Sequence, residues 1–116
     1  MKPLILIIGE VRHTIKQGEY IIIGRDPQYN IVFQNNEISR KHATILHESD
    51  GQVCLIDHKS KNGTYYNEKR ILNSERITLP GKIKLGPISL YLQREDETTK
   101  ENKIPKESTE INLDLD

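Results

Sequence analysis

The chain has 116 residues, enough for one domain with a single hydrophobic core but not for two. Hydrophobic residues make up 34% of it, and with no Trp and a single Phe the core is expected to consist of Ile, Leu and Val. The net charge of zero hides an asymmetry, because residues 1–94 carry a balance of +5 and residues 95–116 a balance of −5. We therefore predict a basic domain over 1–94 followed by an acidic tail over 95–116.

The first apolar run, Leu4 to Ile8, bears on targeting. It is too short for the core of a signal peptide or for a membrane span, and Glu10 and Arg12 follow it at once. The single cysteine, Cys54, cannot form an internal disulfide, and its apolar neighbours favour a buried, inert thiol. Both features predict a cytoplasmic protein without a membrane partner.

Short apolar runs separated by turn residues dominate residues 1–94. The runs typical of strands are Leu4–Ile8, Tyr20–Ile23, Ile31–Phe33, Ala43–Leu46 and Val53–Ile56. Farther along, apolar residues alternate with polar ones through Ile77–Leu79, Ile83–Leu85 and Ile88–Leu92. Turn signals lie at Gly18, Asp50-Gly51, Asn62-Gly63 and Pro80-Gly81. With no 3.6-residue apolar period, the pattern predicts an all-β antiparallel sandwich of roughly ten short strands.

Three polar patches adjoin these strands and are expected on loops, where binding residues are commonly held. The first is Gly24 and Arg25, directly after the run Tyr20–Ile23. Glycine permits a tight turn, and the planar, permanently charged guanidinium of Arg25 suits phosphate oxygens. Taken alone, the dipeptide is also typical of an ordinary surface turn.

The second patch, Ser39 to His42, precedes the run Ala43–Leu46. The hydroxyl of Ser39 can donate to an anion, and the adjacent cations Arg40 and Lys41 add positive charge. His42 is expected to bridge backbone groups and hold the loop in shape, in preference to a catalytic role.

The third patch, Lys61 to Thr64, contains Asn62-Gly63. Asn-Gly signals a plain hairpin turn, but an Asn side chain also offers one acceptor and two donors, which recognition of an extended peptide backbone requires. Asn67 is expected to act within the turn after Thr64–Tyr66. Together the three patches predict a phosphate-binding surface.

The same residues would also be compatible with other functions, but the sequence argues against each. A hydrolase would use Ser39, His42 and Asp57 as a triad, but the sequence offers no nucleophile elbow and no oxyanion hole. A nucleic-acid binder would use the +5 charge of residues 1–94, but the five Tyr and one Phe show no stacking pattern. No metal site is expected, because the histidines lack ligand spacing: His13, His42, His47 and His58.

In their order and intervals, the three patches resemble the forkhead-associated (FHA) domain family, whose pattern is Gly-Arg, then Ser-x-x-His, then Asn-Gly with a further Asn. The resemblance covers about residues 20–92. It implies an eleven-stranded β-sandwich, without enzymatic activity or a cofactor, that binds phosphothreonine peptides through loops at one end. It also implies Ser/Thr kinase signalling, with a phosphothreonine protein and an upstream kinase as partners. The alternative is a related scaffold or nucleic-acid-associated module that does not depend on phosphate.

The resemblance also implies roles for individual residues. Arg25 and Ser39 correspond to phosphate ligands, Asn62 to the residue that hydrogen-bonds the peptide main chain, and Lys61 and Arg40 to positions beside the phosphate. Four residues correspond to structural positions of the motif: Gly24, His42, Gly63 and Asn67. Glu37 corresponds to a position that reads the third residue after the phosphothreonine, where its charge is expected to repel Asp or Glu.

The tail over 95–116 has a different composition from the domain. It is rich in Lys, Glu, Thr, Asn and Ser and almost lacks apolar residues before Ile111, Leu113 and Leu115, so we expect it to be mobile. Thr98 and Thr99 are candidate phosphorylation sites, and a phosphorylated tail is expected to fold back onto the basic loops of its own domain. An inert linker is the alternative.

Overall fold

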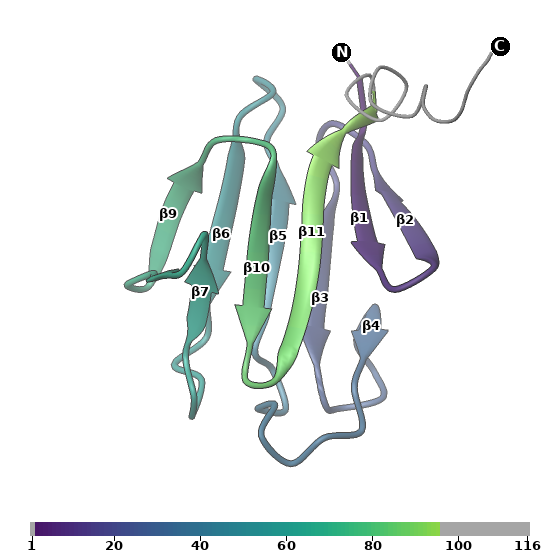
Figure 1. The fold of residues 1–116 in the computed structure, drawn as a ribbon. Coiled ribbons are helices and arrows are strands. Elements are labelled where there is room, and N and C mark those ends of the chain that lie inside the picture. Colours follow the sequence, from purple (N-terminus) through teal and green to yellow (C-terminus); the bar gives the residue numbers. More distant parts are fainter. Residues whose placement is uncertain (1, 96–116) are drawn as a thin grey trace, which may run out of the picture.

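The apolar runs of the sequence form β-strands that are arranged in two layers. The structure is a computed structural model that describes residues 2–95, so Thr98, Thr99 and the rest of the tail lie outside the described residues. Within that range eleven strands make two facing sheets, as in a β-sandwich (Figure 1). The described part of the chain contains no helix long and apolar enough to cross a membrane.

The first sheet has six strands in the order β2-β1-β11-β10-β7-β8. All neighbouring strands of this sheet pair antiparallel. The strands of this sheet are Leu4–Ile8 (β1), Val11–Ile15 (β2), Thr64–Tyr66 (β7), Lys69–Arg70 (β8), Gly81–Leu85 (β10) and Ile88–Arg94 (β11).

The second sheet has five strands in the order β4-β3-β5-β6-β9. Its strands are Tyr20–Gly24 (β3), Ile31–Val32 (β4), Ala43–His47 (β5), Val53–Asp57 (β6) and Ser74–Ile77 (β9). The pair β3–β4 is parallel, whereas the other pairs of this sheet are antiparallel, as the sequence predicts for the sandwich as a whole. The loop over 25–30 first carries the chain back along β3, where the N–H of Ile22 donates to Oδ1 of Asn30 (2.7 Å), so that β4 then runs in the same direction as β3.

The core lies between the sheets and is almost wholly aliphatic, as the composition predicts. Because successive side chains of a strand point to opposite faces, every second one points into the core. Burying each large apolar side chain contributes roughly 1.5–3 kcal/mol to the stability of the fold. The fully buried aliphatic side chains include Leu4, Leu6, Ile15, Ile23, Ile38, Ile45, Leu55, Ile83, Leu85, Leu90 and Leu92.

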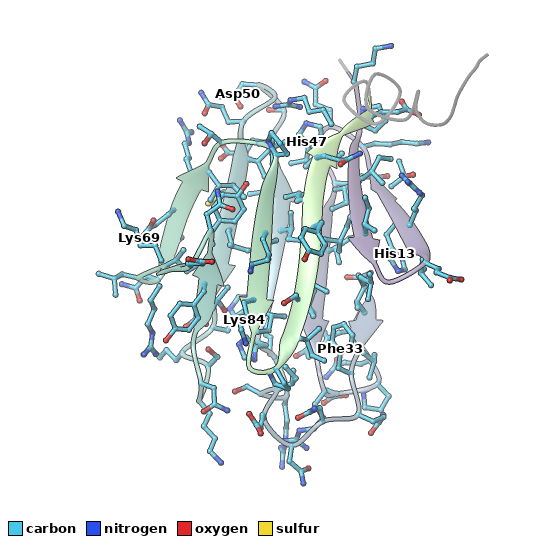
Figure 2. The ribbon with its side chains drawn as sticks, viewed as in Figure 1. His13, Phe33, His47, Asp50, Lys69 and Lys84 are labelled. Carbon is cyan, nitrogen blue, oxygen red and sulfur yellow. The ribbon has the colours of Figure 1, made fainter. Side chains whose placement is uncertain are left out.

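The loops that carry the three polar patches lie together at one end of the sandwich. Figure 1 shows the connections β3–β4, β4–β5, β6–β7 and β10–β11 at the lower end, and the β5–β6 turn with the end of β11 at the upper end. Figure 2 labels Phe33 at the lower end and His47 and Asp50 at the upper end. The rigid sheets therefore position the candidate site at one end, and the chain leaves the described domain at the other.

Candidate functional site

Arg25 begins the first loop, and the structure holds it tightly against the second. Its backbone N–H donates to the carbonyls of Ser39 (3.0 Å) and Arg40 (3.1 Å). A Cβ on Gly24 would lie 1.9 Å from the carbonyl oxygen of Arg40, so glycine is required for this close approach. The Nε of Arg25 donates to the carbonyl of Ile38 (3.0 Å), and among residues 2–95 its two Nη groups have no hydrogen-bond partner. The guanidinium is thus fixed at one nitrogen and open at the other two.

Ser39 lies beside this guanidinium, where the second loop meets the third. Its Oγ accepts a hydrogen bond from the backbone N–H of Lys61 (2.9 Å), which leaves the hydroxyl proton available for a ligand. The ion pairs within residues 2–95 are Arg76–Glu48 and Lys82–Glu68. The cations Arg25, Arg40 and Lys61 at the loop end therefore carry charges that no described carboxylate neutralises.

His42 is fully buried and ties the second loop to the third. Its Nδ1 accepts a hydrogen bond from the N–H of Ser39 (3.1 Å), so Nε2 carries the ring proton and donates it to the carbonyl of Gly63 (2.9 Å). Both ring nitrogens are occupied in holding backbone groups. The imidazole therefore sets the distance between the loop of Ser39 and the loop of Asn62.

Asp57, at the end of β6, organises the third loop, a role not predicted from the sequence. Its Oδ1 accepts hydrogen bonds from the hydroxyls of Ser60 (2.5 Å) and Thr64 (2.7 Å). Burial acts to raise the pKa of Asp57, but these hydrogen bonds outweigh it and hold the pKa below its ordinary value. Ser60 Oγ in turn accepts the N–H of Gly63 (3.0 Å), whose φ of +86° suits glycine. An Asp at a strand end with a hydroxyl residue three positions later is the signal that could have found this network.

The connection through Asn62 and Gly63 is not a hairpin turn, so the plain-hairpin interpretation is wrong. The strands on either side of it, β6 and β7, belong to different sheets. The tight hairpin lies farther on, between β7 and β8, where Asn67 and Glu68 have φ values of 49° and 72°.

Asn62 and Glu37 meet at the rim of the site. The Nδ2 of Asn62 donates to the carbonyl of Glu37 (2.9 Å), while its Oδ1 accepts no hydrogen bond from residues 2–95. The N–H of Glu37 donates to Oδ1 of Asn35 (2.8 Å), and a Cβ on Gly86 would lie 3.3 Å from the Cβ of Glu37. Glu37 is therefore held next to the β10–β11 turn, where Figure 2 labels Lys84. Beside it is an open hollow of about 380 Å³ lined by Asn62, Tyr65, Glu68, Lys84 and Gly86.

The structure does not bring Asn67 to these loops. Its N–H donates to the carbonyl of Lys82 and its Oδ1 accepts the N–H of Lys82, both at 2.8 Å. Asn67 therefore fastens the β7–β8 turn to β10, along the side of the sandwich.

The geometry also bears on the two rival sites. Neither ring nitrogen of His42 bonds Ser39 Oγ or the Asp57 carboxylate, so Ser39, His42 and Asp57 do not form a catalytic triad in this structure. No group of three or more His, Cys, Asp or Glu side chains within residues 2–95 is arranged to hold a metal ion. At His58, burial and the nearby charge of Lys41 lower the pKa of the imidazole, which favours its neutral form.

Comparison with known proteins identifies the family. The sequence profile of the FHA domain matches residues 21–86, more than half of the chain, and the chain belongs to this family. The fold is similar to the FHA domain of the CT664 protein from Chlamydia trachomatis, with a TM-score of 0.74 and 27% identity over 78% of this chain and 96% of that one. It is also similar to the N-terminal FHA domain of S. cerevisiae Rad53p in complex with a phosphothreonine peptide, with a TM-score of 0.70 and 20% identity over 84% and 98% of the two chains.

Curated relatives extend well beyond this domain. The human sarcolemmal membrane-associated protein is 33% identical over 75 residues, which are 64% of this chain and 9% of that protein. The chain spans between 9% and 20% of the length of the curated relatives it matches.

Proposed function

We propose that residues 1–94 bind phosphothreonine peptides through the three loops and catalyse no reaction. Arg25 and Ser39 bind the phosphate, Asn62 binds the peptide main chain, and Arg40 and Lys61 add positive charge beside the phosphate. The observation that carries the proposal is the guanidinium of Arg25, which is held through Nε and open at both Nη groups. A fork of this kind is preorganised for two oxygens of a phosphate group.

The same arrangement discriminates against an unmodified threonine. A phosphothreonine carries a charge of about −1.5 to −2 at neutral pH and three acceptor oxygens, whereas threonine has a neutral hydroxyl. Each charge-assisted hydrogen bond contributes roughly 1.5–3 kcal/mol to the binding of the phosphate. The unneutralised cations at this end also raise the association rate of an anionic peptide.

The proposed context is signalling by Ser/Thr kinases in the cytoplasm. A binding module for phosphothreonine requires an upstream kinase that supplies the modified residue. The phosphothreonine peptide bound by the S. cerevisiae Rad53p domain supports this ligand class for a domain of the same fold.

Fluorescence polarisation with a labelled degenerate peptide library tests the proposal. The library carries a fixed phosphothreonine at its centre, and matched libraries carry phosphoserine or threonine. We expect the phosphothreonine library to bind, the threonine library not to bind, and phosphoserine to bind about fivefold more weakly, because it lacks a methyl group worth on the order of 1 kcal/mol. Equal binding of the phosphothreonine and threonine libraries would refute phosphate dependence.

Glu37 is proposed to select the third residue after the phosphothreonine. Its carbonyl is held by Asn62 and its N–H by Asn35, so the backbone fixes where the carboxylate projects. We expect peptides with Lys at that position to bind about two- to fivefold more tightly than those with Asp, since an exposed charge pair contributes roughly 0.5–1 kcal/mol. Glu37→Lys should reverse the preference, and added salt should weaken it.

The control for this substitution is Glu19→Lys, which makes the same charge change at an exposed position just before β3, at the opposite end of the sandwich. It should leave the peptide preference as it is in the unmodified domain. A preference for Asp in the unmodified domain would contradict the role of Glu37.

Chain length limits the proposal that a phosphorylated tail binds its own loops. The strand β11, Ile88–Arg94, runs from the loop end to the opposite end, a span of roughly 20 Å. From Glu95, fully extended chain reaches about 10 Å to Thr98 and about 14 Å to Thr99. Both reaches are shorter than the span of roughly 20 Å back to the loops, so neither threonine can bind there while β11 stays paired in the sheet. We therefore propose that the bound phosphothreonine belongs to another molecule, either another protein or a second copy of this chain.

A further inference from the structure

The outer face of the second sheet is unusually apolar for a sheet face that meets solvent. Inward side chains of β3, β5 and β6 form the core, yet the outward positions of the same strands are also mostly apolar. Tyr20 pairs with Leu46, and Leu46 with Cys54, across adjacent strands. We define the outer apolar face by its residues: Tyr20, Ile22, Leu46, Cys54 and Ile56.

The first sheet provides a comparison within the same molecule. Its outward cross-strand pairs mostly contain a charged or polar member, such as Ile7 with Arg12, Lys82 with Tyr91, and Lys84 with Ser89. Ile7 with Tyr91 is an exception in this sheet, and Thr44 is the polar outward residue on β3, β5 and β6. An antiparallel sheet with one solvated face normally alternates in this way, whereas a strand that is apolar on both faces is typical of a sheet covered on both sides. The outer apolar face therefore has the composition of a covered surface.

The exposure of this face shows that the described residues leave it open. Tyr20 is 58% exposed, and Ile22, Leu46, Cys54 and Ile56 are half-buried. A shallow hollow of about 310 Å³ lies on the face, lined by Tyr20, Ile22, Lys41, Thr44, Leu46 and Ile56.

The chain leaves the described domain at the end of the sandwich where the β5–β6 turn lies. The Nη2 of Arg94 donates to the carbonyl of Gly51 (2.9 Å), in the turn between β5 and β6. Gly51 is three residues before Cys54, a distance of about 10 Å along the strand. Glu95 therefore follows the end of β11 at the β5–β6 end of the sandwich, far from the phosphate-binding loops (Figure 1), and the outer apolar face begins beyond the β5–β6 turn.

The sequence after Glu95 contains one segment with a complementary pattern. Over residues 111–116, Ile111, Leu113 and Leu115 alternate with Asn112, Asp114 and Asp116, so an extended chain would present three aliphatic side chains on one side. The fifteen residues over 96–110 connect this segment to the domain. A linker of that length has a root-mean-square span of roughly 20 Å, which is enough to reach the face.

We propose that residues 111–116 bind the outer apolar face of the same molecule, with Ile111, Leu113 and Leu115 packed against β3, β5 and β6. The tether supplies an effective concentration on the order of 1 mM, so three aliphatic contacts are enough for substantial occupancy. A second copy fits the face less well, because a standard interface uses about 20–30 residues a side and this face has five. The proposal does not depend on phosphopeptide binding.

Cys54 is a built-in probe for this contact, because it is the only cysteine of the chain and lies on the outer apolar face. We would measure the rate at which N-ethylmaleimide modifies Cys54 in the full chain. The test variant replaces Ile111, Leu113 and Leu115 with Ser. The control variant replaces Asn112, Asp114 and Asp116 with Ser; these are the polar residues that alternate with the three aliphatic ones.

The expected result is that the test variant reacts about 2- to 10-fold faster than the unmodified chain. This ratio follows from an effective concentration of about 1 mM and a dissociation constant of about 0.1–1 mM for the contact between residues 111–116 and the outer apolar face. The control variant should react at the unmodified rate, and the rates should not depend on protein concentration. Circular dichroism would verify that all three proteins are equally folded.

Two results would overturn the proposal. Equal rates in the unmodified chain and the test variant would mean that the segment leaves the face uncovered. Protection of Cys54 that grows with protein concentration and survives in the test variant would assign the face to a second copy.

Discussion

Replacing Arg25 with Ala is expected to weaken binding of a phosphothreonine peptide by about 2 to 3 kcal/mol, or about 30- to 150-fold. The substitution removes the two Nη groups that we propose as phosphate donors, together with a full positive charge. It also removes the Nε bond to the carbonyl of Ile38 (3.0 Å), but that carbonyl lies in a part-buried loop where water can replace the lost donor. Fluorescence polarisation or calorimetry with the phosphothreonine library measures the loss.

The matched control is Arg76→Ala. Arg76 lies on β9, far from the three loops, and its guanidinium is paired with Glu48 at 3.2 Å. The control removes the same charge from the domain, so it separates the local contact from the general attraction between a basic domain and an anionic peptide. Equal affinity losses in the two variants would contradict a specific role for Arg25. Arg25→Lys should give an intermediate affinity, since an ammonium keeps the charge but loses the planar fork.

The strands and the three polar patches could be predicted because their signals are local. Runs such as Tyr20–Ile23 and the alternation through Ile88–Leu92 report burial over a few neighbouring residues, and the structure places β3 and β11 there. The patches were predicted on loops because they adjoin these strands. The structure places those loops at one end.

Other features depend on contacts between distant parts of the chain. The sequence predicts Gly24 as a turn glycine, but the structure requires it because a Cβ would strike the carbonyl of Arg40. Asn67 belongs to the same motif as Asn62, yet it bonds β10 along the side of the sandwich. These roles follow from the packing of one loop or strand on another, which residue spacing does not encode.

The continuous apolar runs of β3 and β6 also carry a signal about the outward face of the second sheet. Residues 20–23 and 53–56 are apolar at every position, where a strand with one solvated face would alternate. In the structure the second, outward set of these side chains makes up most of the outer apolar face. The same pattern therefore predicted strands correctly and also indicated a second apolar surface.

Replacing His42 with Ala is expected to lower the free energy of unfolding by about 2 to 4 kcal/mol and to weaken phosphopeptide binding about tenfold or more. The side chain is fully buried, and its loss leaves the N–H of Ser39 and the carbonyl of Gly63 without their partners. The loops that carry Ser39 and Asn62 then lose the link between them. Urea denaturation measures the first effect, and fluorescence polarisation of the folded variant measures the second.

His47→Ala separates these two effects. His47 is as fully buried as His42, and its Nδ1 bonds the carbonyl of Ile15 (3.1 Å) at the end away from the loops, where Figure 2 labels it. Its removal should also cost stability, because a similar cavity forms, but the dissociation constant of the folded protein should stay unchanged. If His42→Ala also left that constant unchanged, His42 would stabilise the fold without positioning the site. A loss of affinity confined to His42→Ala would establish that one buried imidazole holds the phosphate-binding loops in register.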